Sequence, residues 1–286
     1  MKKSILARTK SGEIQITVNI PVSEIKKAYE KILEEIVKEI KIPGFRKGKA
    51  PKKIVEGKIE KSKIYERVIR ELIPQLYAEA IKEHNLNPII TPKIEILKME
   101  ENKDWEIRIT TCEEPEIELG NYREEIKKVL CPTKIWTPKK LKDSAESKDS
   151  QDEKIQKVIE KLLEVVKITL PEILVENEVN RALSNLINQT NNLGITIDQY
   201  LSSIGKTAQA LREEYRRKII EQLTLQFALD KIAEEEKIEV PESEINDLIK
   251  AVNDENLKEN FNNSLQRSYL KGILKRRKVL DFLAKF

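Results

Sequence analysis

One long helical pattern constrains the fold of this chain more than any other feature. Residues 207–238 read TAQALREEYRRKIIEQLTLQFALDKIAEEEKI, with Thr207 as the N-cap, and predict a helix of about thirty residues, roughly 45 Å long. Helices of this length protrude, because they cannot all wrap around one core in a chain of 286 residues. Charged residues make up 36% of the chain and aromatic residues only 5%, which is typical of a helix-rich protein with large solvated faces. We therefore expect about two domains and an elongated shape.

Helical periodicity also dominates the rest of residues 154–286. We expect Pro171 at the first position of one helix, Gly194 just after its end, and Thr196 as the N-cap of the next helix. The segments PESEINDLIKAV and NLKENFNNSLQRSYLKGILKRRKVLDFLAKF continue the pattern. The sequence therefore predicts an all-α domain of about six helices over residues 154–286.

In the first 115 residues, apolar residues recur with the two-residue period of a strand in some segments and with helical spacing in others. Residues 4–20 alternate apolar and polar residues around a Ser-Gly turn and predict a β-hairpin that Pro21 ends. We expect Ser23 to cap the next helix, which ends before Pro43.

A second helical stretch and two more strands complete this region. Pro51 is expected at the first position of a short helix, and Pro74 should kink or break the following helical region near Leu72. Two strands follow, at 93–99 and 105–112. Residues 1–115 are thus predicted to form an α+β domain with one four-stranded sheet.

Residues 116–153 differ in composition from both flanking regions. The segment contains two prolines and then a Ser/Lys/Asp-rich tract of low hydrophobicity from Lys139 onward. We interpret it as an extended arm followed by a linker that we expect to be mobile. Trp136 either packs the arm onto the helical body or offers an exposed contact.

Composition and motifs exclude several classes of protein. Two cysteines without metal-ligand spacing give neither a disulfide framework nor a metal site, and His84 is the only histidine, so no cofactor is expected. No phosphate-binding GxxxxGK[ST] loop occurs. Without a signal-peptide pattern or an apolar run long enough to span a membrane, we expect a cytoplasmic protein with no membrane partner.

Charge is unevenly distributed along the chain. The net charge is only +4. Between Lys38 and Arg67, however, the sequence contains eleven Lys or Arg and only four Glu, and a second basic run, KGILKRRK, lies near the C-terminus. Such runs are either solvated helix faces or contacts with an acidic partner such as RNA.

The loop IPGFRKGKAP carries a resemblance to a known family. Its pattern Gly-Phe-Arg-x-Gly-x-x-Pro resembles the signature loop of trigger factor, the bacterial ribosome-associated chaperone. The segments VIRELIPQLYAEAIKEHNLNPIITPKIEI, EEPEIELGNY, LPEILVENEVNRAL, LGITIDQYLSSIGKTAQALREEYRRK, LDKIAEEEKIEVPESEI and LKRRKVLDFL are similar to the family in the same order. The match covers residues 1 to about 122 and 155–286.

The resemblance implies a function for the loop. In the family it contacts a ribosomal protein beside the nascent-chain exit of the large subunit, so the implied ribosome-binding residues are Gly44, Phe45, Arg46, Lys47 and Gly48. Phe45 would enter a pocket on the partner, while the cationic side chains would pair with acidic groups or rRNA phosphates. The alternative is that Phe45 folds back onto its own domain.

The implied architecture is an α+β N-terminal ribosome-binding domain and an all-α elongated C-terminal chaperone domain with helical arms. Trigger factors typically carry an FKBP-type prolyl isomerase domain between these parts, and residues 116–153 are too few to form one, so we expect no enzyme activity. The arms would hold unfolded nascent polypeptides without ATP. The candidate client-binding residues are apolar and lie on the predicted arms: Ile187, Leu193, Ile195, Tyr200, Leu201, Ile204, Phe261, Leu265 and Tyr269.

Other functions remain open at this point. One is a prolyl isomerase of the trigger factor type that works without the usual domain, and another is a holdase that acts in the cytosol without the ribosome. An RNA-binding protein would need base-stacking aromatic residues between its basic ones, which the chain lacks. Off the ribosome, a homodimer is a further option.

Overall fold

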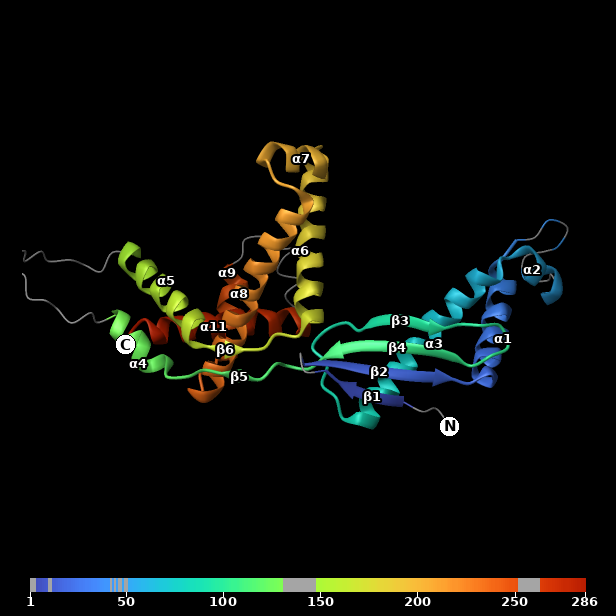
Figure 1. Cartoon of the computed structure of the whole chain (residues 1–286), viewed down its shortest axis with the longest axis horizontal. Coiled ribbons are helices and arrows are strands. Elements are labelled where there is room, and N and C mark those ends of the chain that lie inside the picture. Colours follow the sequence, from blue (N-terminus) through green and yellow to red (C-terminus); the bar gives the residue numbers. More distant parts are fainter. Residues whose placement is uncertain are drawn as a thin grey trace, which may run out of the picture. The chain divides into compact units, whose positions relative to one another are not determined.

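The computed structural model describes residues 4–9, 12–41, 43, 45, 48, 51–130, 148–251 and 263–286 (Figure 1). They form two compact units, one of Met1–Glu114 with Pro171–Leu174 and one of Pro115–Leu170 with Val175–Phe286. The first unit is α+β and the second is mostly helical, as the sequence predicts.

A four-stranded antiparallel sheet forms one layer of the first unit. Its strands are β1 (Ser4–Arg8), β2 (Glu13–Ile20), β3 (Lys93–Lys98) and β4 (Trp105–Cys112), in the order β1-β2-β4-β3. Leu6, Ile16, Ile109 and Ile94 lie opposite one another across the four strands. Because alternate side chains point to opposite faces, this register places the buried residues Ile14, Ile16, Val18 and Ile20 of β2 on the same side as Trp105, Ile107 and Ile109 of β4. The predicted hairpin and strands are confirmed.

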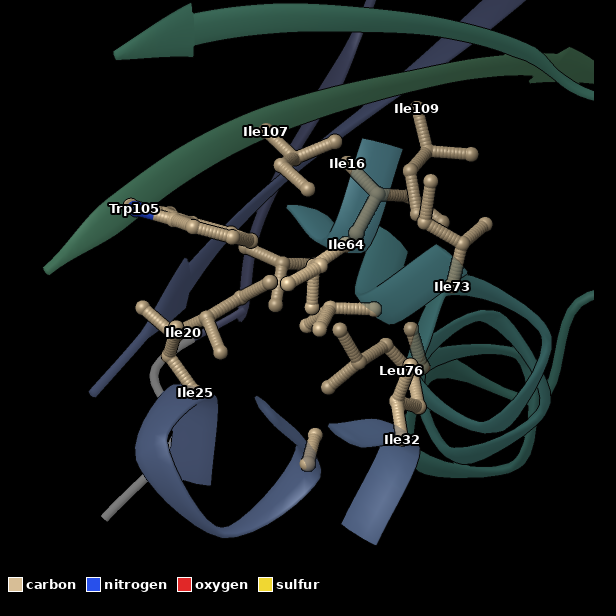
Figure 2. Close-up of a cluster of buried hydrophobic side chains, with 14 of the residues drawn as sticks. Ile16, Ile20, Ile25, Ile32, Ile64, Ile73, Leu76, Trp105, Ile107 and Ile109 are labelled. Atoms are coloured by element: carbon tan, nitrogen blue, oxygen red, sulfur yellow. The ribbon is translucent and has the colours of Figure 1, made fainter. Parts of the chain in front are cut away.

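The described residues of the same unit form three helices: α1 (Val22–Glu39), α2 (Lys52–Lys58) and α3 (Lys61–His84). Figure 2 shows side chains of α1 and α3 meeting those of the sheet in one core. The residues labelled there are Ile16, Ile20, Ile25, Ile32, Ile64, Ile73, Leu76, Trp105, Ile107 and Ile109. A chain of aromatic rings extends this core, with Trp105 against Tyr65 and Tyr65 against Tyr29, each pair 5.4 Å between ring centroids.

Local predictions about prolines and caps need correction. Pro21 and Pro51 are N-cap residues in extended conformation, so Ser23 lies inside α1 and Pro51 lies one position before α2. Of the kink or break expected near Leu72, the break does not occur, since α3 continues through Pro74. Pro74 is exposed, while Ile73 and Leu76 are buried beside it. Packing of these neighbours thus holds the helix together around the one backbone hydrogen bond that proline removes.

The second unit contains seven described helices and a short pair of strands. The strands are β5 (Ile117–Glu118) and β6 (Lys167–Ile168), which pair antiparallel. The helices are α4 (Tyr122–Leu130), α5 (Lys148–Val165), α6 (Glu172–Asn192), α7 (Ile197–Ile204), α8 (Ala208–Glu235), α9 (Glu242–Ala251) and α11 (Ser264–Leu283). Buried residues of α4, α5, α8 and α11 form a separate core in which Ile126, Leu162, Ile232 and Leu283 are almost fully buried.

Within residues 116–153, where the sequence predicts an extended arm and a linker, the described parts contain the extended strand β5 and two helical stretches. Residues 122–130 form α4, whose Tyr122 and Ile126 are buried in the second core, and α5 already begins at Lys148. Tyr122 also donates a hydrogen bond to Glu236 at 2.9 Å. Apolar residues of this segment thus pack into the core of the helical unit. Trp136 and Cys131 lie outside the described residues.

The long helix and its caps follow the sequence. Helix α8 has 28 residues, and Thr207 accepts a hydrogen bond from the Ala210 backbone at its start. Thr196 caps α7 through two hydrogen bonds. Its hydroxyl accepts from the Gln199 backbone N–H, and its own backbone N–H donates to the Gln199 side chain. Gly194 has a φ of +73° after the end of α6, where the Ile195 N–H bonds to the Thr190 carbonyl at 3.0 Å.

Candidate functional site

The loop between α1 and α2 is held at both ends by packed helices. Helix α2 is anchored by Val55, which is fully buried in the first core, and by the Tyr29 hydroxyl of α1, which donates to Glu56 at 2.9 Å. Burial and the bond to Glu56 raise the pKa of Tyr29, which keeps the phenol protonated at physiological pH. The loop is therefore presented by a rigid scaffold.

Two of the five predicted loop residues are described. The side chain of Phe45 is 39% exposed, so its ring is only partly covered by the protein. Gly48 has a φ of +78°, and a Cβ there would lie 3.6 Å from the carbonyl oxygen of Lys38. The loop therefore returns to the end of α1 in a conformation that favours glycine. Gly44, Arg46 and Lys47 lie outside the described residues.

Several basic residues beside the loop are already paired. Lys52 donates to Glu34 at 2.6 Å, and the lysine lowers the pKa of that carboxyl. Arg67 lies 3.4 Å from Glu39. These pairs fix side chains of α1, α2 and α3, and they reduce the positive charge that the sequence count suggests for this region.

Exposed apolar residues gather where α6 leads into α7. Figure 1 shows α7 at the turn between α6 and α8. Leu193 is 75% exposed, and Ile187, Ile195 and Ile204 are exposed as well. Tyr200 and Leu201 are half-buried, and no residue of α7 is fully buried. We call residues 187–204 the α6–α7 tip. It brings together six of the nine predicted client-binding residues.

The other three predicted residues lie elsewhere in the sequence. Tyr269 on α11 is 68% exposed. Leu265 belongs to the same helix, but its side chain is not described, and Phe261 lies outside the described residues. The prediction missed exposed Ile273, although its position four residues after Tyr269 on one helix was a readable signal. Exposed Ile54, on α2 beside the loop, was also missed.

Two of the five basic residues of the C-terminal run are paired within the protein. Arg276 pairs with Asp230 of α8, and Lys278 pairs with Glu244 of α9 at 2.7 Å. Lys275 is half-buried and Arg277 is exposed. These two pairs join α11 to α8 and α9, whereas no ion pair to a described residue engages Lys271, Lys275 or Arg277.

Within the described part of the chain, no group of three or more His, Cys, Asp or Glu side chains could hold a metal ion. None of the helices described there is both long and apolar enough to cross a membrane.

Two family models match the chain. The model for "Bacterial trigger factor protein (TF)" matches residues 1–162, and the model for "Bacterial trigger factor protein (TF) C-terminus" matches residues 137–285. The chain belongs to the trigger factor family. The two trigger factor models overlap at residues 137–162, and no isomerase domain is detected in the chain.

Similar proteins are consistent with this assignment. Trigger factor of Staphylococcus epidermidis is 34% identical over 116 residues, which cover 41% of this chain and 27% of that protein. Trigger factor of Natranaerobius thermophilus is 37% identical over 112 residues, which cover 39% of this chain and 25% of that protein. The chain spans about a quarter of the length of these curated relatives.

One solved trigger factor structure shares the whole fold. It is described as "Promiscuous Substrate Recognition in Folding and Assembly Activities of the Trigger Factor Chaperone". It matches 99% of this chain and 99% of its own chain with a TM-score of 0.68 at 15% identity. The helical second unit and the α+β first unit therefore follow a trigger factor arrangement of elements.

Proposed function

We propose that this trigger factor family member is an ATP-independent chaperone that docks on the ribosome and holds unfolded nascent polypeptides. The observation that carries the proposal is the partly exposed ring of Phe45 in a loop anchored between α1 and α2. An aromatic side chain held on a rigid scaffold can bury its ring in a partner at little cost in conformational entropy.

In this proposal the first unit binds the ribosome. Phe45 fills a pocket on a large-subunit protein at the tunnel exit, and Arg46 and Lys47 pair with carboxylates or rRNA phosphates beside it. Gly44 and Gly48 permit the tight backbone of the loop. The positive φ of Gly48 supports that role.

The second unit, residues 115–170 and 175–286, would hold the client. The α6–α7 tip offers Leu193, Ile187, Ile195 and Ile204 to solvent. Emerging chains expose apolar segments before they can fold, and a few scattered apolar contacts bind such segments weakly. A weakly bound segment is released once folding buries it, so no nucleotide is needed. Tyr269 and Ile273 on α11 form a second contact of the same kind.

We further propose that the protein has no prolyl isomerase activity and works in the cytoplasm, where nascent chains emerge. The lack of a detected isomerase domain supports the first point. A refolding assay limited by proline isomerisation tests it, and an acceleration of the slow phase by this protein would contradict it.

Cosedimentation with vacant 70S ribosomes tests the docking proposal. We compare the wild type with a loop variant, Phe45→Ala/Arg46→Ala/Lys47→Ala, and with a control, Lys82→Ala/Arg181→Ala, which removes two exposed positive charges outside the loop. We expect micromolar-range binding that only the loop variant loses.

Other outcomes would redirect the proposal. Equal binding by all three proteins would make the loop a structural element. Absence of binding by the wild type would leave a holdase that acts without the ribosome, and gel filtration would then show whether the free protein is a homodimer.

A further inference from the structure

A groove lies beside the loop on the surface of the first unit. Its volume is about 540 Å³, and its walls are the C-terminal end of α1, the N-terminal half of α3 and Ile59 after α2. The floor is apolar: Ile36 is buried, and Ile40 and Ile59 are half-buried. A groove of this size accommodates several side chains of a partner.

The rim of the groove carries three basic and two acidic side chains. Helix α3 contributes Lys63, Arg67, Arg70 and Glu66, and α1 contributes Glu39. The charge of Glu39 is balanced by Arg67 at 3.4 Å, and Lys63 lies 3.3 Å from Glu60.

Arg70 is the rim cation best placed to meet a partner. It is exposed and forms no ion pair with a described residue, and exposed Glu66, four residues before it on α3, is the rim carboxylate that likewise forms none. An unengaged guanidinium beside apolar side chains favours a partner that presents an apolar group next to a carboxylate.

The groove is continuous with the loop. Ile40, in the floor, is the C-cap residue of α1 and directly precedes the loop segment. At the other end of the loop, a Cβ on Gly48 would lie 3.7 Å from the Cα of Lys38, so the loop closes on the same end of α1. The groove therefore lies at the end of α1 that the loop leaves at Ile40 and approaches again at Gly48.

We propose that this groove is a second docking site for the ribosomal partner, and that it receives a protein segment with an apolar side chain flanked by a carboxylate. The inference rests on the proposed ribosome docking and extends it from one loop to a two-part surface. An rRNA backbone would satisfy Arg70 but has no apolar group to cover Ile40 and Ile59. A protein segment satisfies both features of the groove.

Cosedimentation with vacant 70S ribosomes also tests this inference. Arg70→Glu reverses the unengaged rim charge, and Ile40→Ser removes part of the apolar floor. Lys82→Glu makes the same kind of charge reversal at an exposed position near the C-terminal end of α3. We expect about tenfold weaker binding for Arg70→Glu, about fivefold for Ile40→Ser, and less than about twofold for Lys82→Glu. Thermal melts check folding, and Ile59→Ser replaces Ile40→Ser if that variant is unstable.

The outcomes separate the two proposals. Weaker ribosome binding by both groove variants supports the inference. Weakening by Arg70→Glu alone, with a folded floor variant that binds normally, would assign the groove to phosphate and overturn the proposed occupant. Normal binding by both groove variants, with loss in the loop variant, overturns the groove and leaves loop docking intact. A wild type that does not bind ribosomes overturns both.

Discussion

Arg276 and Asp230 form an ion pair with a bifurcated hydrogen bond, and this pair joins α11 to α8. The Nε–H of Arg276 donates to both carboxylate oxygens of Asp230, at 2.9 and 3.2 Å. Both side chains are less than a third exposed. The pair lies beside the second core, where Val279 and Leu283 of α11 pack with Ile232 of α8. It therefore fixes the position of the last helix in the unit proposed to hold clients.

Removing this pair should destabilise the second unit. Arg276→Ala is expected to lower the free energy of unfolding by about 1 kcal/mol, because Asp230 loses its charged partner in a partly buried site. Urea unfolding of Arg276→Ala, Asp230→Ala and the double variant measures the coupling free energy of the pair, which we expect to be about 0.5–1 kcal/mol. Exposed Arg277→Ala is the control, with an effect near zero. A coupling of zero would mean that the pair contributes nothing to stability.

Two glycines in the first unit should respond in opposite ways to alanine. Gly48 has a φ of +78°, so Gly48→Ala should cost about 1 kcal/mol and weaken ribosome binding by distorting the loop. Gly57 lies inside α2, and a Cβ there would contact nothing within 4 Å. Gly57→Ala should therefore stabilise the protein by about 0.5 kcal/mol or more. Urea unfolding measures both changes, and equal effects would contradict the assigned loop conformation.

Much of the fold could be predicted from local patterns. The alternation around Ile14–Ile20 and the helical spacing around Thr207 identify a strand and a helix because each element buries one face. Helix α3 did not follow its local signal, because Ile73 and Leu76 pack on either side of Pro74. Helix α4 was missed because its short apolar pattern is stable only against the second core, which no local window contains.

The candidate site was less accessible to sequence reasoning. The loop was found through its Gly-Phe-Arg motif, and the α6–α7 tip through apolar residues at helical spacing. The groove was missed, because Ile40, Ile59 and Arg70 come from three separate segments that only folding brings together. The engagement of Arg276 and Lys278 was missed for the same reason, since a run of like charges in the sequence does not reveal carboxylates on other helices.

The α6–α7 tip should bind clients without stabilising the fold. Ile187→Ser/Leu193→Ser is expected to reduce suppression of aggregation of a chemically unfolded test protein by about half or more, because it removes exposed apolar surface. Its unfolding free energy should stay within about 0.5 kcal/mol of wild type, since both residues are exposed. Gln189→Ser, at an exposed polar position between them, is the control. Unchanged suppression by the double variant would remove the tip from the client-binding surface.

Glu214 on α8 should make stability depend on pH in the acidic range. Hydrogen bonds from Lys206 and from Lys218, the latter at 2.8 Å, lower its pKa to about 2 from the ordinary 4.5. A carboxylate whose pKa is lowered by folding contributes stability above its unfolded pKa and loses it as pH falls toward the folded value. The melting temperature of wild type should therefore exceed that of Glu214→Gln at pH 6. The difference should shrink below about pH 4.5 and vanish near pH 2. Lys218→Met, which keeps one donor, should lie between them. A difference that is the same at every pH would rule out this linkage.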